Sequence, residues 1–352
     1  MNKELKIAIC PHKGYFSDRW IQYCENNHIP YKLVDPYRSN IVAQVADCNA
    51  FMWQIGQTNY RDLEFGKSVL YSLQQRGIKV FPDFNTCWHF DDKIAQKYLL
   101  ESIGAPLVQS YVFYDEKTAL DWTATAEFPK VFKLKGGAGA SNVKLAHNRN
   151  EAKKLIKQCF GIGFAQYRWL DKFKENYHKY KEGKLHFRDV IRPFFYAFKK
   201  YPNEFAHYHQ NEIGYVYFQD FIPNNTFDIR VCVVGDKAFA LKRLTRKGDF
   251  RASGSGNIVY DRQQIDERCV SIAYDVNKKL KAQSVAFDFV FDENNQPLIV
   301  EISYGYSIKA YDSCEGYWTH DLVWHEGTHF DFCGWMVENL INQVVYDNEK
   351  LK

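Results

Sequence analysis

Short apolar runs alternate with stretches of helical periodicity along the first ninety residues of the chain. The runs are rich in β-branched and aromatic residues, whereas the stretches between them repeat their apolar positions every three or four residues. The expected strands are 6–10, 31–34, 50–53 and 79–81, and the expected helices are 17–27 and 62–76. This alternation predicts a small α/β domain with a parallel sheet, which the turn residues Pro82-Asp83-Phe84-Asn85 close.

A second domain is expected to begin near residue 91, where Asp91-Asp92-Lys93 opens a helical pattern that ends at Gly104-Ala105-Pro106. Residues 160–214 break the α/β rhythm and are interpreted as an insertion. The other predicted elements are strands 129–133, 143–145, 215–221, 229–234 and 238–242, helices 149–158 and 264–280, and a hairpin 284–301. We therefore expect two domains, 1–90 and 91–350, of α/β and α+β class.

The composition is that of a globular protein and excludes several classes. With 46% hydrophobic and 25% charged residues, the 352-residue chain is not collagen-like, of low complexity or wholly disordered. Lysines and arginines number 46 against 42 acidic residues, which gives a net charge of +4. This weak basic excess suits an anionic ligand but not a nucleic-acid coat, so we expect no nucleic-acid partner.

Cysteine usage and the lack of targeting signals favour the cytoplasm. The nine cysteines are an odd number without a C-x-x-C pair, so the sequence predicts reduced, buried thiols rather than a disulfide framework. We recognise no secretory signal, and no apolar run reaches the roughly 18 residues of a membrane span. A cytoplasmic protein without a membrane span is the expectation.

A glycine-rich loop carries the first chemical signal. Gly136-Gly137-Ala138-Gly139-Ala140-Ser141 has only small side chains, so its backbone N–H groups can approach a phosphate, and Lys133 and Lys135 stand just before it. The loop matches neither the Walker A motif nor G-x-G-x-x-G. The alternative is a flexible hairpin loop.

Two carboxylates form the second signal. Asp288 and Glu301 lie in otherwise apolar strands, with Ser303 beyond, and a carboxylate is expensive to bury without a partner. On strands joined by a short turn they can face each other and share a divalent cation such as Mg²⁺. The alternative is that both point to solvent.

The third signal is a series of cations followed by small residues. Arginine forks suit phosphates and carboxylates, and small neighbours let such a ligand approach the backbone. The cations are Arg230, Lys242, Arg243, Arg246 and Arg251, and the small residues are 252–256. The alternative is a solvated basic face.

These signals, in this order, resemble the ATP-grasp superfamily, nearest to the ribosomal-protein glutamate ligase branch of carboxylate–amine ligases. The resemblance spans about residues 91–307, and residues 1–90 are similar to the pre-ATP-grasp domain that usually comes first. It implies an α/β domain followed by a two-lobed ATP-grasp fold that binds ATP between the lobes.

The resemblance also implies roles for individual residues. Lys93 and Lys133 would reach the phosphates, the glycine-rich loop would fold over them, and residues 219–222 would form the hinge strand at adenine and ribose, with Asp220 where glutamate is commoner. The implied nucleotide contacts are Lys93, Lys133, Gly136, Gly137, Gly139, Ser141, Gln219, Asp220, Phe221, Ile222, Asp228 and Arg230.

Metal binding and catalysis are implied for a second group of residues. Asp288 and Glu301 match the Mg²⁺ carboxylates of the family, and Ser303 stands where the family usually has asparagine. Arg243 and Arg251 fall where cations act near the γ-phosphate and the acyl group, with Lys133 as the third catalytic residue.

A rival motif is the sequence His325-Glu326-Gly327-Thr328-His329, which satisfies the zinc-protease pattern H-E-x-x-H. Gly327 and Thr328 are weak helix formers at positions where the motif needs a helix interior. We therefore expect a loop or a structural role at this segment rather than a zinc site.

The expected function is an ATP-dependent ligase that forms an amide through an acylphosphate intermediate. The insertion mixes aromatic and basic residues, which suits a sugar acid or a glycan precursor as the carboxylate, although a peptide or amino acid is nearly as plausible; the expected amine is an amino acid. Two alternatives stay open: a kinase that phosphorylates a hydroxyl, and a nucleotide-binding module without turnover. Whether two chains form a homodimer is also left open.

Overall fold

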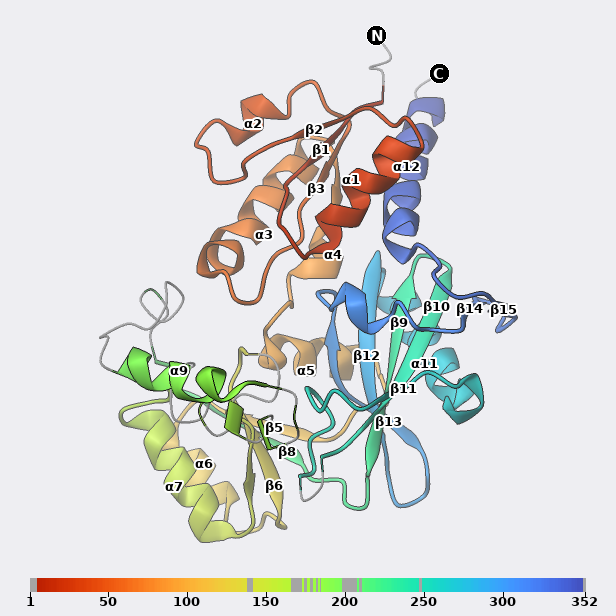
Figure 1. Cartoon of the computed structure of the whole chain (residues 1–352). Helices are drawn as coiled ribbons and strands as arrows, with labels where there is room; N and C mark the ends of the chain where they lie inside the picture. The colour runs from red at the N-terminus through yellow and green to blue at the C-terminus, as the bar shows by residue number, and fades with distance from the viewer. Residues whose placement is uncertain are drawn as a thin grey trace.

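The computed structural model describes residues 5–137, 142–165, 173, 176, 177, 180, 181, 183, 185–197, 208, 211–246 and 249–350. Figure 1 shows an N-terminal α/β unit at one end and two further lobes, each built on its own sheet. The mixed α/β and α+β class predicted from the sequence is confirmed.

The N-terminal sheet has four parallel strands in the order β2-β1-β3-β4. These are β1 (Ile7–Ile9), β2 (Tyr31–Leu33), β3 (Ala50–Met52) and β4 (Lys79–Phe81), and the helices are α1 (Phe16–Asn26), α2 (Ile41–Gln44), α3 (Tyr60–Gln75) and α4 (Phe84–Cys87). Alternate residues of the strands pack to opposite faces: Ile7 and Ile9 pack with α1, whereas Ala8 packs with residues of α3. Because both faces are buried, β1 reads as a continuous apolar run.

One local prediction in this part was wrong. Residues 82–85 were expected to form a turn, but Phe84–Cys87 is a short helix, α4. The Asp83 side chain caps it by accepting a hydrogen bond from the Thr86 backbone N–H at 2.9 Å. Aspartate is as favourable at a helix N-cap as in a turn, so composition alone could not distinguish the two.

The smaller lobe is an antiparallel sheet in the order β5-β8-β6-β7. Its strands are β5 (Ser110–Phe113), β6 (Lys130–Lys133), β7 (Lys144–Ala146) and β8 (Val216–Asp220), and helices α6 (Glu116–Trp122) and α7 (Arg149–Phe160) cover one face. The expected insertion falls between α7 and β8, and much of it lies outside the described residues. Its described part includes α9 (Phe187–Ala197).

The larger lobe is a seven-stranded sheet in the order β13-β12-β9-β10-β14-β15, with β11 paired to β10. Its strands are β9 (Phe227–Val234), β10 (Lys237–Leu244), β11 (Ile258–Val259), β12 (Ser284–Phe291), β13 (Pro297–Ser303), β14 (Gly316–Thr319) and β15 (Trp324–Glu326). Helices α5 (Lys93–Ser102) and α11 (Glu267–Leu280) cover one face. The predicted hairpin is present as β12 and β13, and Asp292 at its turn accepts hydrogen bonds from two backbone N–H groups.

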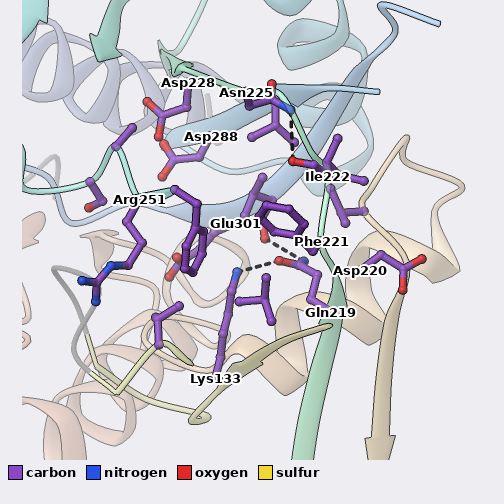
Figure 2. Close-up of a pocket in the computed structure, with 18 of the residues that line it drawn as sticks. Lys133, Gln219, Asp220, Phe221, Ile222, Asn225, Asp228, Arg251, Asp288 and Glu301 are labelled. Atoms are coloured by element: carbon purple, nitrogen blue, oxygen red, sulfur yellow. Dashed lines mark hydrogen bonds between the residues drawn. The ribbon is translucent and has the colours of Figure 1, made fainter. Parts of the chain in front are cut away.

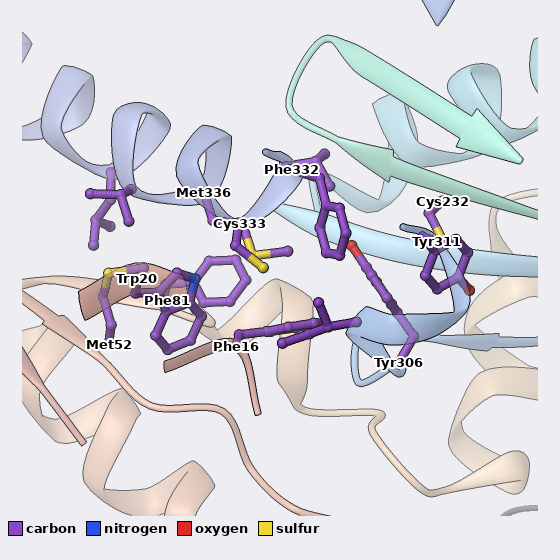
Figure 3. Close-up of a cluster of buried hydrophobic side chains, with 14 of the residues drawn as sticks. Phe16, Trp20, Met52, Phe81, Cys232, Tyr306, Tyr311, Phe332, Cys333 and Met336 are labelled. Atoms are coloured by element: carbon purple, nitrogen blue, oxygen red, sulfur yellow. The ribbon is translucent and has the colours of Figure 1, made fainter. Parts of the chain in front are cut away.

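The last helix, α12 (Phe332–Lys350), returns to the N-terminal sheet and packs beside α1. Figure 3 shows the core that results, in which Trp20 and Phe81 of the N-terminal unit meet Phe332 of α12 and Tyr306, which follows β13. The phenyl ring of Phe332 lies 5.9 Å from the ring of Tyr306 and 6.3 Å from that of Phe16. One apolar cluster therefore joins the N-terminal unit to the larger lobe.

All nine cysteines are free and buried, as the sequence predicted. No helix within the described ranges is both long enough and apolar enough to cross a membrane.

Candidate nucleotide site between the lobes

A cavity lies between the sheets of the two lobes (Figure 2). Its apolar part is lined by Val108, Val131, Val143, Phe221, Ile222, Phe227, Phe250, Val290 and Val300. Its polar part collects side chains from α5, β6, β8, β9, β12 and β13 and from loops beside them. Of the predicted site residues, those that line the cavity are Lys93, Lys133, Gly137, Gln219, Asp220, Phe221, Ile222, Asp228, Arg251, Asp288 and Glu301.

Two buried lysines point into the polar part. Lys93 is the first residue of α5, and the side chain of the N-cap residue Asp92 accepts hydrogen bonds from the Ile94 and Ala95 backbone N–H groups. The Lys93 Nζ lies 3.3 Å from Glu301 Oε1. Lys133 ends β6, and its Nζ donates to Gln219 Oε1 at 2.6 Å (Figure 2). Lys93 is thus paired with Glu301, whereas Lys133 forms no salt bridge with another of the described residues, so Lys133 gains most from an anionic ligand.

The two lysines differ in their proton affinity. Burial disfavours the charged form of Lys93, but the carboxylates of Glu301 and Asp91 outweigh it, so the pKa of Lys93 is raised. Burial lowers the pKa of Lys133 to about 8, the charge of Lys93 adds to this effect, and the carboxylates of Glu301 and Asp288 offset it only in part. Lys93 is therefore stabilised in its charged form, whereas the charged form of Lys133 is destabilised by burial.

The start of the glycine-rich loop is tied to α5. The Gly137 N–H donates to Asp91 Oδ1 at 3.0 Å, and the Gly137 carbonyl accepts from Lys93 Nζ at 2.8 Å. Gly137 has φ +102°, which favours glycine. Gly136 lies next to the cavity lining but not in it, and Gly139 and Ser141 lie outside the described residues.

Four charged side chains form an alternating ladder across three strands. Asp228 and Arg230 lie on one face of β9, and the strand register places them opposite Arg243 of β10 and Asp288 of β12. Arg243 donates to both oxygens of Asp228 at 2.6 Å and approaches Asp288 Oδ2 at 2.9 Å. Arg230 also donates to both oxygens of Asp288. The separate cations and carboxylates of the sequence are thus one buried network.

Asp288 is held ionised by this ladder. Burial favours its neutral form, but the guanidinium groups of Arg230 and Arg243 keep the pKa of Asp288 well below its usual range. Arg230 and Arg243 lie behind Asp288 rather than in the cavity lining.

The carboxylate pair fits a divalent cation in its chemistry. Asp288 and Glu301 are opposite each other in the β12–β13 register, and both line the cavity. Oxygen ligands of this kind suit Mg²⁺, which completes its coordination with waters and substrate phosphates. Ser303 is not brought to the cavity lining, and its Oγ donates to the Gly305 carbonyl at 3.1 Å. Of the three predicted metal ligands, the structure therefore brings Asp288 and Glu301 to the cavity.

The hinge strand supplies a polar anchor. Gln219 Nε2 donates to Ser110 Oγ at 3.2 Å and to the Val300 carbonyl at 3.3 Å, so the amide that receives Lys133 is itself fixed. Asp220 pairs with Lys130 of β6. Its carboxylate is therefore already engaged by a lysine.

Arg251 lines the cavity and its guanidinium is oriented by Asp249 through bonds of 2.7 to 3.1 Å. Sequence reasoning missed its neighbour Phe250, whose ring packs edge-on against Phe221 with centroids 5.7 Å apart. It also missed Asn225, whose side chain both donates to and accepts from the Phe291 backbone. The sequence signal for Phe250 was its position between two charged residues in a polar loop.

The H-E-x-x-H segment is not helical. His325 and Glu326 lie in β15, Gly327 has φ +154° and His329 has φ +62°. The His325 ring stacks on Tyr317 with centroids 5.0 Å apart. Within the described ranges no group of three or more His, Cys, Asp or Glu side chains is arranged to hold a metal ion. Residues Trp324–Glu326 form a strand instead of part of a loop, and the segment lacks the helix that the zinc-protease motif requires; its role stays a prediction.

Chelation of zinc is therefore expected to leave both activity and stability unchanged. The measurement compares nucleotide turnover and the melting temperature before and after dialysis against a zinc-selective chelator. Activity that disappears on chelation and returns with added zinc would contradict this.

Comparisons with known proteins bear on the fold. A family model for the RimK-like ATP-grasp domain matches residues 207–316. The fold is similar to that of a RimK domain ATP-grasp protein from Sphaerobacter thermophilus, with 13% identity, TM-score 0.56 and coverage of 96% of this chain and 99% of that one. No curated protein sequence matches the chain.

Two further solved structures carry ligands. The ATP-grasp ligase PsnB, solved with a minimal precursor, Mg and ADP, has 12% identity and TM-score 0.54 over 96% of this chain and 98% of that one. D-alanine–D-alanine ligase from Bacillus anthracis, solved with ATP, has 11% identity and TM-score 0.56 over 97% and 99%. The predicted ATP-grasp resemblance is confirmed.

Proposed function

We propose that this chain, an ATP-grasp protein by fold, is an ATP-dependent ligase that activates a carboxylate as an acylphosphate and joins it to an amine. One observation carries the proposal: a single cavity combines an apolar slot, two buried lysines and a facing pair of carboxylates. The slot suits a nucleobase, the lysines suit phosphates, and the carboxylates suit the cation that accompanies them.

The lining residues suggest how the nucleotide would be oriented in the cavity. The base fits among Val131, Ile222 and Val300, next to the backbone of the hinge strand β8. Lys93 and Lys133 mark the phosphate end, where the glycine-rich loop begins. Because Asp220 is paired with Lys130, we propose that the hinge backbone, rather than the Asp220 side chain, contacts the base.

Asp288 and Glu301 would hold Mg²⁺ in the proposed enzyme. The metal would neutralise charge on the phosphates. Arg230 and Arg243 keep Asp288 ionised and fix its orientation, so the carboxylate is ready to bind a cation without a change of protonation. Lys133 and Arg251 present fixed positive charge to the cavity, which stabilises negative charge that develops on the transferring group.

We propose a sugar acid or glycan precursor as the carboxylate and an amino acid as the amine. Support comes from the insertion, whose aromatic and basic residues can stack on a sugar and pair with an anion. Arg188 and Arg192 lie on α9, which Figure 1 shows beside the sheet of the smaller lobe. Much of the rest of the insertion, which supports this proposal by its sequence, lies outside the described residues.

Free and buried thiols throughout the chain support a reducing compartment, so we propose that the protein acts in the cytoplasm. Whether it does so as a homodimer stays a prediction.

Addition of Mg-ATP is expected to raise the melting temperature. A ligand that binds only the folded state stabilises it by mass action, by about 2.7 kcal/mol at a hundredfold excess over Kd. Thermal unfolding with Mg-ATP, Mg-GTP and Mg²⁺ alone measures this. No shift at millimolar Mg-ATP would contradict the nucleotide site.

The ligase reaction is tested by trapping its intermediate. With ATP, Mg²⁺ and a candidate sugar acid, hydroxylamine should attack the acylphosphate to give a hydroxamate and release phosphate, with ADP as the second product. ADP formation that requires a hydroxyl compound and releases no phosphate would identify a kinase instead. Nucleotide binding without any ADP formation across the carboxylates tried would favour a module without turnover.

A further inference from the structure

The N-terminal unit carries a second cavity, separate from the one between the lobes. It lies where β1, β2 and β3 end, and its walls include His12, Asp35, Tyr37, Trp53 and Asp62. In the strand order β2-β1-β3-β4, the chain passes from β1 to β2 on one side of β1, and then crosses to β3 on the other side. The carboxyl ends of β1 and β3 therefore border a topological switch point, where open parallel sheets bind their ligands.

Asp62 is a buried carboxylate held only by neutral groups. Its side chain is wholly buried, Oδ2 accepts from the Gly56 N–H at 2.7 Å, and Oδ1 accepts from the Tyr37 hydroxyl. No lysine or arginine of the described ranges forms a salt bridge with it, and burial raises the pKa of Asp62 above its usual range. His12, which also lines the cavity, offsets part of the charge of Asp62, and a cation in the cavity would compensate that charge further.

The remaining walls suit an organic cation. Tyr37 and Trp53 lie edge to face, with ring centroids 5.9 Å apart. Asp35 is a second carboxylate, half exposed, whose Oδ2 accepts from Arg38 at 3.1 Å and whose Oδ1 accepts from the Tyr37 N–H. None of the described residues that line this cavity is a lysine or an arginine. Carboxylates beside aromatic faces are the usual surroundings of a bound ammonium group.

The cavity lies on the side of the N-terminal unit that faces the insertion. Asn59 lines it and caps α3, and the ring of the next residue, Tyr60, stacks on Tyr208 of the insertion with centroids 5.3 Å apart. Figure 1 shows the first turn of α3 on the side that faces α9. A molecule in the cavity would therefore lie near the insertion rather than on the outer surface of the protein.

We propose that this cavity is a second ligand site, which binds a molecule that carries a protonated primary amine. The ammonium group contacts Asp35 and the Tyr37 hydroxyl oxygen, the charge of Asp62 acts through the hydrogen bond that this hydroxyl donates to it, and the carbon skeleton packs against Tyr37 and Trp53. Binding here needs no nucleotide, so its test is independent of the proposed ligase reaction.

The test uses the full chain, labelled with ¹⁵N, and follows the indole N–H resonance of Trp53, which is assigned by its loss in Trp53→Phe. Benzylamine, protonated at neutral pH, is titrated against benzyl alcohol, its neutral counterpart. Benzylamine should shift the resonance saturably and bind about fivefold or more tightly than the alcohol. Either no saturable shift or equal affinity for the two probes would overturn the proposal.

A matched pair of variants locates the charge responsible. Asp62→Asn should weaken benzylamine binding about tenfold while leaving the melting temperature unchanged or raised, since it removes a buried charge without a cationic partner. Asp18→Asn changes an exposed carboxylate that accepts one backbone N–H of the same unit, and it should bind like the unaltered protein. Unchanged binding in folded Asp62→Asn would refute the site. If that variant fails to fold, Asp35→Asn takes its place, with weaker binding expected and unchanged binding decisive against the proposal.

Discussion

Replacement of Lys133 by methionine should stabilise the free chain and remove most of its affinity for Mg-ATP. Lys133 is 7% exposed, and burial lowers its pKa to about 8, so the charged side chain destabilises the folded state at neutral pH. From the usual lysine value of 10.5, this amounts to roughly 3 kcal/mol of lost stability. The phosphates of ATP would compensate the charge, so the same residue is unfavourable without ligand and favourable with it. The expected loss in kcat/KM is about a hundredfold or more.

The pH dependence gives this prediction a distinct signature. Between the folded pKa of about 8 and the ordinary 10.5, the unfolded chain binds more protons at this lysine than the folded chain does. Stability of the unaltered protein should therefore rise with pH across this window, and the advantage of Lys133→Met should shrink. Chemical unfolding at several pH values from 7 to 10.5 measures it. Lys117→Met, at an exposed lysine of the same lobe, is the control. Equal stability changes in both variants would refute the account.

Asp288→Asn is expected to give the largest loss of stability in the site. The substitution leaves Arg230 and Arg243 with weakened partners, although both guanidinium groups are buried in the ladder. Breaking a buried ion pair on one side destabilises a protein by about 3–5 kcal/mol. Turnover should disappear as well, because the neutral amide is a poor Mg²⁺ ligand. Urea unfolding and the ADP assay measure the two effects.

Glu301→Gln separates these effects. Glu301 is only partly buried, but its salt-bridge partner Lys93, at 3.3 Å, is buried; Asp91 still stabilises the charge of Lys93 after the substitution, so stability should fall by about 1–3 kcal/mol, less than in Asp288→Asn. Turnover should still fall about a hundredfold, since half of the carboxylate pair is lost. Asp236→Asn, at an exposed carboxylate, is the control for both variants. Full turnover in Glu301→Gln would show that Glu301 is not a metal ligand. Unchanged stability in Asp288→Asn would show that the buried ion pairs of the ladder do not stabilise the fold together.

The sequence predicted the elements that carry their own periodicity. The β12–β13 hairpin follows from apolar alternation and the residues of one turn, whereas the facing of Asp288 and Glu301 also depends on an irregularity between Asp288 and Phe289 that shifts the register by one residue. The sequence predicted local structure less well where a turn and a helix N-cap favour the same residue type. Asp83 is an example, because it caps a helix where a turn was expected.

Contacts between distant strands were beyond the sequence. Asp228, Arg230, Arg243 and Asp288 each looked like a separate ligand-binding residue, because their pairing depends on the register of β9 with both neighbours. The same is true of Phe250, which reaches the cavity only because its loop folds back against Phe221. Periodicity places a side chain on a face of its own element, but it does not say which other element that face meets.

The return of α12 to the N-terminal sheet has a consequence for the order of folding during synthesis. The strands β1 to β4 leave the ribosome first, but Phe16, Trp20 and Phe81 lack the side chains of residues 332–344 that complete their core. Residues 82–331 are translated in between, which takes roughly 10 to 50 seconds at typical rates. Until α12 docks, an apolar face of the nascent unit stays accessible to chaperones and to other unfolded chains. The N-terminal unit, first to be made, is thus among the last to be finished.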